Sequence, residues 1–277
     1  TGDSYVVGFR SQNSRNYAVS TVNRSQLQYL TPDEAAALPR FELAADPGQT
    51  NAVYAMFQRA DNFTRSYGVS PEGGSLSTLG YEKATPILGG QASYDRVWGD
   101  YRRYVSLPWQ HHVLALRGTM GLNWGKNGGH FFVGGIDAPH FLSQVDLTAA
   151  TDVFHASIGM RGYDVAGIGN KMALLSAEYR FPLLEVNKGL WTLPFYMDRL
   201  YGVLGYDVSN TWDSPFGSVR QFQAGETVHG ASAELRSKMT LFRYLRTDFR
   251  LGIAQGLVSN STTRPSTQYI MGFGTTF

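Results

Sequence analysis

The feature that most constrains the fold of this chain is a two-residue alternation of apolar and charged side chains. In 231–242, "ASAELRSKMTLF", Glu234, Arg236 and Lys238 alternate with apolar residues, and 245–257, "LRTDFRLGIAQGL", repeats the pattern. Successive side chains of a β-strand point to opposite faces, so each segment is predicted to be a strand with one apolar and one charged face.

The same alternation and the turn signals between segments predict an all-β chain with ten to twelve antiparallel strands. The predicted strands are 5–12, 17–30, 51–66, 75–84, 93–107, 111–124, 172–184, 199–212, 231–242, 244–257 and 268–277. A polar insertion at 31–50 is predicted to hold a short helical turn after Thr31, because Pro32 is followed by Asp33 and Glu34.

Composition favours a membrane barrel among the all-β folds. The 277 residues include 31 Gly, 16 Tyr, 16 Phe and 5 Trp, and the mean hydropathy is only −0.23. Aromatic girdles and apolar residues at alternate positions are typical of transmembrane β-barrels. A soluble β-sandwich alternates in the same way, so periodicity alone leaves both folds open. No apolar run is long enough for a transmembrane helix.

Several function classes receive no support from the sequence. The chain has no cysteine, and its six histidines are scattered except for His111 and His112. We therefore expect no metal site and no cofactor. The net charge of +2 gives no indication of nucleic-acid binding.

The last predicted strand, "QYIMGFGTTF", places aromatic and apolar residues at alternate positions and ends on phenylalanine. It resembles the C-terminal strand of bacterial outer-membrane barrels. The resemblance implies that Tyr269, Met271, Phe273 and Phe277 form a signal recognised by the outer-membrane assembly machinery.

A glycine-rich segment, "MRGYDVAGIGNK" (160–171), raises the question of what Arg161 contacts. Alternation places Glu178 and Asp207 on the charged faces of the two strands that follow. A guanidinium can bind a carboxylate through two hydrogen bonds, which favours a buried contact inside a barrel. Gly162 would permit a tight turn, and Tyr163 offers a ring and a hydroxyl for packing. The alternative is a solvent-exposed hairpin loop with an incidental Arg-Gly-Tyr.

This segment and the strand "SAEYRFPL" after it resemble the outer-membrane assembly factor superfamily, also called the bacterial surface antigen family, which includes BamA/TamA-like barrels. The resemblance implies a transmembrane β-barrel, with sixteen strands in the family, and a long loop folded into its lumen. It implies that Arg161, Gly162 and Tyr163 latch this loop to Glu178 and Asp207.

The resemblance also implies a function in outer-membrane protein insertion or protein translocation, or in exporting or anchoring a fused periplasmic domain. Residues 1–277 are then one bacterial outer-membrane barrel domain that lacks its N-terminal strands or periplasmic domains. The implied partners are outer-membrane lipid, the assembly machinery, and a client or periplasmic protein.

An outer-membrane phospholipase or a passive pore is the alternative. Candidate Ser/His pairs are His229 with Ser232 and His155 with Ser157, but neither pair has a recognisable third member. The chain contains no G-x-S-x-G motif. We therefore expect no enzymatic activity and place His111 and His112 in a periplasmic turn.

Overall fold

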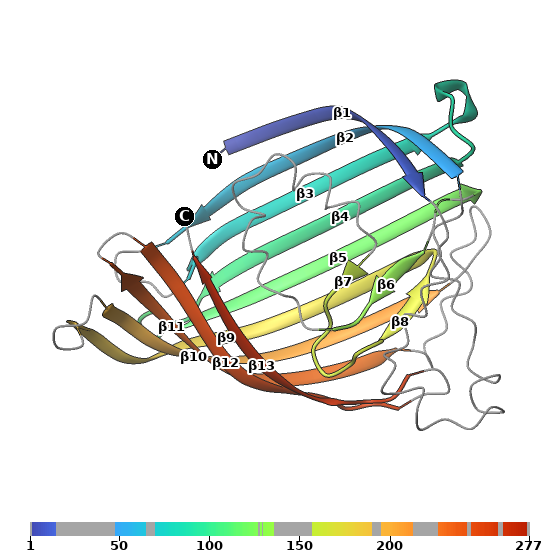
Figure 1. Cartoon of the computed structure of the whole chain (residues 1–277). Coiled ribbons are helices and arrows are strands. Elements are labelled where there is room, and N and C mark those ends of the chain that lie inside the picture. The colour runs from blue at the N-terminus through green and yellow to red at the C-terminus, as the bar shows by residue number, and fades with distance from the viewer. Residues whose placement is uncertain are drawn as a thin grey trace.

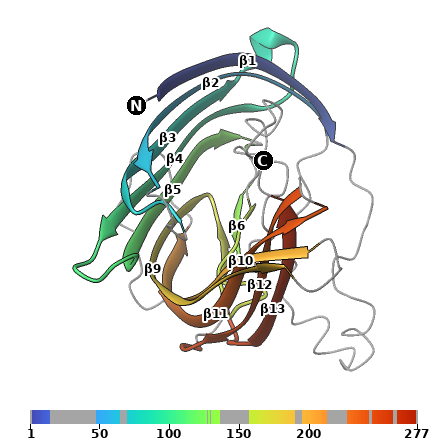
Figure 2. The same cartoon turned by 90° about the vertical axis from the view of Figure 1, so that its left-hand side faces the viewer.

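The computed structural model describes residues 2–14, 48–64, 70–126, 128, 130–135, 157–189, 195–212, 227–242, 245–259 and 263–275. These residues form one curved antiparallel sheet of ten strands in the order β1-β2-β3-β4-β5-β9-β10-β11-β12-β13. The sheet wraps around a central space to give an incompletely closed barrel (Figures 1 and 2). The predicted all-β, antiparallel barrel is therefore confirmed.

The wall strands are long, as expected of strands that cross a membrane at a tilt. Their bounds are β1 Gly2–Ser14, β2 Gly48–Phe63, β3 Gly73–Ala84, β4 Ser93–Ser106, β5 Val113–Lys126, β9 Lys171–Gly189, β10 Phe195–Trp212, β11 Val228–Leu241, β12 Leu245–Gly256 and β13 Thr267–Thr275. Each corresponds to a predicted strand within a few residues at either end. The predicted strand 17–30 and the helical turn after Thr31 lie outside the described residues.

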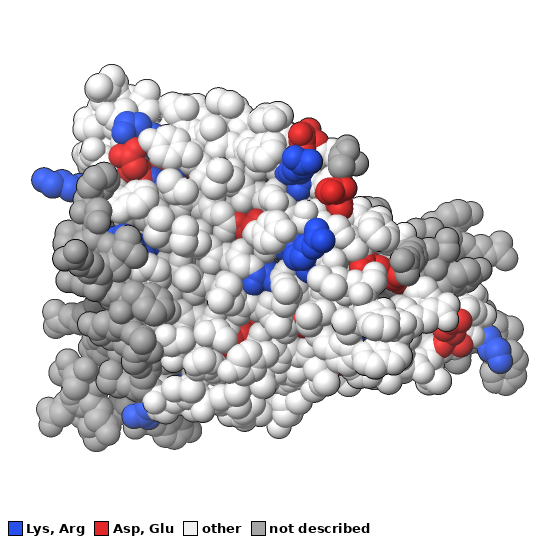
Figure 3. All heavy atoms as spheres, turned by 180° about the vertical axis from the view of Figure 1, so that it is seen from behind, with Lys and Arg blue, Asp and Glu red and all other residues white. Residues whose placement is uncertain are grey.

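The outer face of the wall is apolar. Outward side chains such as Leu79, Leu116, Leu204 and Ile253 are exposed in the isolated chain, and Figure 3 shows a wall surface on which uncharged residues predominate. Alternation places both Asp95 and Arg103 on the outer face of β4. Eight residues separate these charges, or about 26 Å along a strand, which matches the apolar band of outer-membrane barrels.

The sheet has two free edges. β1 and β13 stand at opposite ends of the strand order and are not paired with each other in the described part of the chain. Ten wall strands are described, whereas the resemblance implied sixteen in the family. The open edges and this lower number are the main differences from the expected closed barrel.

A second, smaller sheet lies inside the curve of the first (Figures 1 and 2). It consists of β6 (Phe131–Val133), β7 (Ser157–Ile158) and β8 (Gly167–Gly169), in the order β7-β6-β8. The alternation of the sequence did not predict these strands, because they are too short to show a period.

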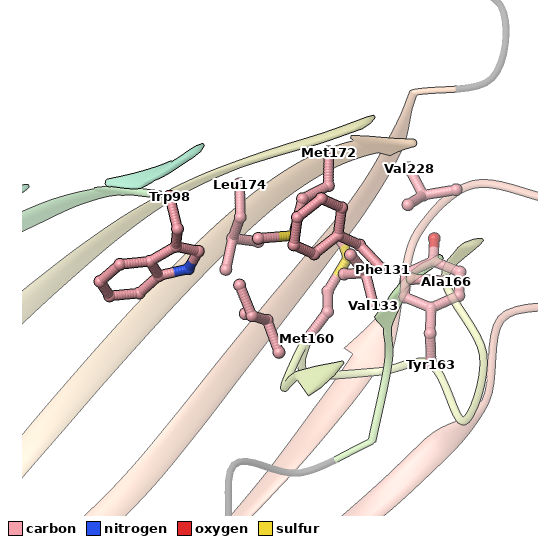
Figure 4. Close-up of a cluster of buried hydrophobic side chains, with 10 residues drawn as sticks. Trp98, Phe131, Val133, Met160, Tyr163, Ala166, Met172, Leu174 and Val228 are labelled. Atoms are coloured by element: carbon pink, nitrogen blue, oxygen red, sulfur yellow. The ribbon is translucent and has the colours of Figure 1, made fainter. Parts of the chain in front are cut away.

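The largest apolar core joins this inner sheet to the wall. Phe131 and Val133 of β6 pack with Met160 and Tyr163 of the following turn and with Met172 of β9 (Figure 4). All five side chains are almost completely buried. The space inside the wall is therefore packed with side chains at this level.

Helices contribute little. The described residues include one 3-10 turn, η1 (Pro86–Leu88), and no helix of the length and hydrophobicity needed to cross a membrane.

Candidate functional site

The turn that carries Arg161 lies inside the barrel, between β7 and β8. Backbone hydrogen bonds join it to the end of β6, where the Met160 N–H donates to the Gly135 carbonyl (2.9 Å) and the Gly135 N–H donates to the Tyr163 carbonyl (2.7 Å). Gly162 has φ of 87°, a left-handed conformation that favours glycine. The inner sheet thus fixes the direction in which the Arg161 side chain extends from the turn.

Arg161 contacts three carboxylates on three neighbouring wall strands. Its Nε lies 2.6 Å from Asp207 Oδ2 and its Nη2 lies 2.5 Å from Oδ1. Its Nη1 donates to Glu178 Oε1 at 2.8 Å and lies 3.5 Å from Glu234 Oε1. The contact with Asp207 is bidentate, the geometry that makes arginine–carboxylate pairs both strong and directional.

The burial of these groups makes their pairing energetically necessary. The side chain of Glu234 is 0% exposed, that of Asp207 is 4% exposed and that of Arg161 is 11% exposed. A charge removed from water is stable only if opposite charges and hydrogen bonds compensate it. Removing Arg161 would leave three buried carboxylates without their shared partner.

Glycines on the wall make room for the turn. An added Cβ at Gly205 would lie 2.5 Å from Arg161 Nη1, and one at Gly230 would lie 2.1 Å from the Arg161 carbonyl oxygen. At Gly256 it would lie 2.5 Å from the Gly162 carbonyl oxygen. Gly230 of β11 and Gly256 of β12 therefore make room for the backbone of the turn, and Gly205 of β10 makes room for the Arg161 guanidinium group.

The rest of the turn is bound to β11, to β13 and to the segment between β12 and β13. The Gly162 N–H donates to Gln268 Oε1 on β13 at 2.8 Å, and the Ser266 N–H donates to the Gly162 carbonyl at 2.9 Å. The Tyr163 hydroxyl lies 2.8 Å from the carbonyl oxygens of His229 and Val258 and accepts the Val258 N–H at 2.9 Å. The turn thus reaches the edge strand of the sheet.

The structure brings together all five residues for which a latch was expected, namely Arg161, Gly162, Tyr163, Glu178 and Asp207. Glu234 and Gln268 were not predicted from the sequence as partners of the turn. Glu234 was visible as a charge on the lumen face of its strand. The sequence held no signal that its carboxylate would reach the same arginine, because that depends on the path of the loop.

The predicted C-terminal signal is partly described. Tyr269 and Met271 point outward from β13 and are 79% and 81% exposed. Phe273 lies in β13 opposite Phe249 of β12, and Phe277 lies outside the described residues. A recognition role for these residues stays a prediction.

The candidate Ser/His pairs receive no support. His229 and Ser232 are three residues apart on β11 and so project from opposite faces of the sheet. His155 lies outside the described residues.

In the turn between β4 and β5, His111 Nδ1 lies 2.7 Å from Glu72 Oε1, and His112 Nδ1 lies 2.6 Å from the Tyr179 hydroxyl. Nowhere in the described ranges do three or more acidic or histidine side chains gather as metal ligands.

A second buried charge cluster lies on the N-terminal half of the wall. Glu82 of β3 is 0% exposed and pairs with Arg10 of β1 and, at 3.6 Å, with Arg96 of β4. The Tyr94 hydroxyl donates to Glu82 at 2.8 Å and accepts from Arg10 at 2.8 Å. Arg96 also donates to the Gly128 carbonyl after β5. The alternation of the sequence did not predict this cluster.

Comparison with known proteins agrees with this architecture. BamA from Haemophilus ducreyi lacking POTRA domains 1-3 is similar in structure, with a TM-score of 0.57, 14% identity and coverage of 99% of this chain and 51% of that chain. At this identity the likeness shows the fold alone, and the chain spans about half the length of that structure. No curated protein matches the chain in sequence. The model of the Omp85 superfamily domain matches residues 6–243, and the chain therefore belongs to the Omp85 superfamily.

Proposed function

We propose that this chain is a bacterial outer-membrane barrel that takes part in protein insertion or translocation, or that exports or anchors a fused periplasmic domain. Membership of the Omp85 superfamily supports this class of function. The apolar outer face supports a place in the lipid of the outer membrane. The superfamily works without covalent chemistry, which agrees with the separation of His229 from Ser232 on β11.

The observation that carries the proposal is the attachment of the Arg161 turn to strands on one side of the open seam. Through Arg161 the turn is held by β9, β10 and β11, and through Gly162 it is held by the edge strand β13. We infer that Arg161, Gly162 and Tyr163 act as a latch that keeps these strands in register. Glu178 and Asp207 are the wall partners of this latch.

The free edges of the sheet give the proposed function its mechanism. An edge strand presents unpaired N–H and C=O groups that can pair with another extended chain. Among the described strands, β1 and β13 are the two that have such an edge. An incoming client strand can add to one of these edges while the latch keeps the neighbouring strands ordered.

The passive pore is less well supported. A pore needs an unobstructed lumen, whereas the inner sheet and the Arg161 turn pack against the wall from inside, with Tyr163 and Met160 both 0% exposed.

Residues 1–277 are proposed to form the barrel part of a larger protein whose N-terminal strands or periplasmic domains lie beyond this segment. Its proposed partners are outer-membrane lipid, the assembly machinery and a client or periplasmic protein.

Reconstitution tests the proposed function. The chain is placed in liposomes, an unfolded outer-membrane barrel protein is added, and its folding is followed by its shift in gel mobility. We expect folding several-fold faster than in empty liposomes, slower with Arg161→Ala, and unchanged with Arg103→Gln on the outer face. Equal rates with and without the chain would refute insertion, and steady single-channel conductance would favour the pore.

A further inference from the structure

The outer face of the wall carries a groove that crosses β9 to β13 and has a volume of about 540 Å³. Side chains that point away from the lumen line it, namely Leu183, Leu204, Leu235, Leu251, Ile253 and Tyr269. The lining includes one charged residue, Glu234, whose side chain is 0% exposed and turned to the lumen. A charged partner would therefore find no opposite charge in this groove.

Two small residues form the floor of the groove. Gly202 of β10 is opposite Leu235 of β11, and Ala233 of β11 is opposite Leu204 of β10. The two small residues are therefore diagonal neighbours, each with a leucine beside it. On β12, Ile253 is opposite Ala233 and forms the next part of the rim.

Aromatic rings close one end of the groove. A Cβ added at Gly202 would lie 2.5 Å from the Phe181 ring, so this ring lies against the floor. Phe181 stacks on Tyr179 at a centroid distance of 5.2 Å and on His112 at 6.3 Å. Trp109, in the turn between β4 and β5, lies 5.7 Å from the His112 ring and is 63% exposed. Aromatic side chains with a polar tip are typical of the level at which a membrane meets water.

The groove runs obliquely from this end of the wall toward the other end. Tyr179 is opposite Leu114, the second residue of β5, whereas Tyr269 is opposite Ile253, close to the last residue of β12. β5 and β12 run in the same direction, because three antiparallel strands separate them. Four strand spacings of about 4.8 Å make the groove about 19 Å long, comparable with the hydrocarbon of one leaflet, about 15 Å.

We propose that this groove binds one phospholipid, with an acyl chain over Gly202 and Ala233 and the headgroup beside Trp109 and His112. This proposal rests on the proposed place of the chain in the outer membrane. An unbranched acyl chain matches a narrow apolar groove of this length. Other lipids offer the same apolar surroundings, so binding depends on close packing in the groove and on the polar contacts of the headgroup. Since the groove ends at Tyr269 of the edge strand β13, the bound chain covers the outer face next to the open seam.

Native mass spectrometry tests the proposal by counting the phospholipids that stay bound. The chain is reconstituted in liposomes of phosphatidylethanolamine and phosphatidylglycerol, its membrane association is measured by flotation, and it is then extracted in a mild detergent. We expect one phospholipid per chain to stay bound at detergent concentrations that remove the others.

The matched variants are Ala233→Leu and Ala55→Leu. Both alanines are exposed on the outer face, and Ala55 lies on β2, away from the groove. Ala233→Leu fills the floor and is expected to lower the retention of phospholipid about fivefold or more, whereas Ala55→Leu is expected to leave it unchanged. Ile253→Phe, which narrows the groove from β12, is the second variant if Ala233→Leu does not fold.

Trp109→Ala tests the headgroup end of the groove. It is expected to weaken retention about threefold, because it removes an interfacial ring. The control is Ile87→Ala, which changes a side chain that is 93% exposed in η1, at the other end of β4. Unchanged retention in Trp109→Ala would overturn the headgroup contact.

The outcomes separate this proposal from the proposed function. Flotation without a retained phospholipid, or an equal loss in Ala233→Leu and Ala55→Leu, would overturn the lipid site and leave the place of the chain in the membrane standing. A chain that does not float with the liposomes would refute both.

Discussion

The two halves of the wall bury charge in different ways. In the N-terminal half, Glu82 is surrounded by side chains of the wall itself, Arg10, Tyr94 and Arg96. Ala52 and Ala84 are completely buried beside them, so Arg10 on the edge strand β1 can reach across β2 to β3. This cluster joins neighbouring strands to one another.

In the C-terminal half, the wall supplies carboxylates and a segment from the lumen supplies the arginine. Glycines of β10, β11 and β12 take the place that the small alanines have in the N-terminal half. They admit the backbone of the turn as well as the Arg161 side chain. Clusters of buried charge in one barrel can therefore serve two purposes. The Glu82 cluster holds the edge strand β1, and the Arg161 cluster holds an inserted segment.

The largest expected effect is that of Arg161→Ala. It leaves Asp207, Glu178 and Glu234 buried without their common partner, and we expect a loss of about 3–5 kcal/mol in the free energy of unfolding. Guanidinium titration of the barrel in detergent micelles measures it. Hydrogen exchange should increase in 157–169 while β1 stays protected.

The control for this variant is a charge exchange. The double variant, Asp207→Arg with Arg161→Asp, should recover part of the stability that is lost when the ion pair is broken. Asp207→Arg in a chain that keeps Arg161 should show no such recovery. An unchanged free energy of unfolding in Arg161→Ala would refute the latch.

Glu82→Gln is expected to have the next largest effect, about 2–3 kcal/mol, because Arg10 and Arg96 lose their shared charge while the side-chain volume is kept. Here hydrogen exchange should increase in β1, not in the turn. Faster exchange in 157–169 with an unchanged β1 would show that the two clusters do not have the separate purposes described above.

Tyr163→Phe is expected to cost about 1–2 kcal/mol, because the partly buried Val258 N–H loses its acceptor and the ring packing is retained. The unfolding midpoint in guanidinium, with an unchanged slope, reports this loss. A cost as large as that of Arg161→Ala would mean that the hydroxyl, and not the ion pairs, holds the turn.

The smallest expected effect is the coupling between the clusters. In Arg161→Ala combined with Glu82→Gln, the two losses should add to within about 0.5 kcal/mol, as is usual for sites without shared partners. Arg96 does lie over the Phe131 ring at 5.6 Å, and Phe131 packs in the core that includes Tyr163. A larger coupling energy would indicate that this contact transmits strain between the halves.

Much of the wall was predictable because its strands alternate between lipid and lumen. The segments 75–84 and 93–107 were predicted almost at the bounds of β3 and β4, and a change of one residue would turn the buried Glu82, Arg96 and Asp100 to the lipid. The inner strands were not predictable. β7 has two residues and β6 and β8 have three each, too few to show a period.

The sequence by itself determined which side chains face the lumen, because a period of two assigns Glu178, Asp207 and Glu234 to one face whatever the register. It also supplied the Arg-Gly-Tyr that resembles the family. The tertiary structure alone decided which charges meet. Strand register and the path of the turn place Arg161 between three carboxylates and set Arg102 opposite Arg117, because contacts between distant segments depend on how the sheet curves around its lumen.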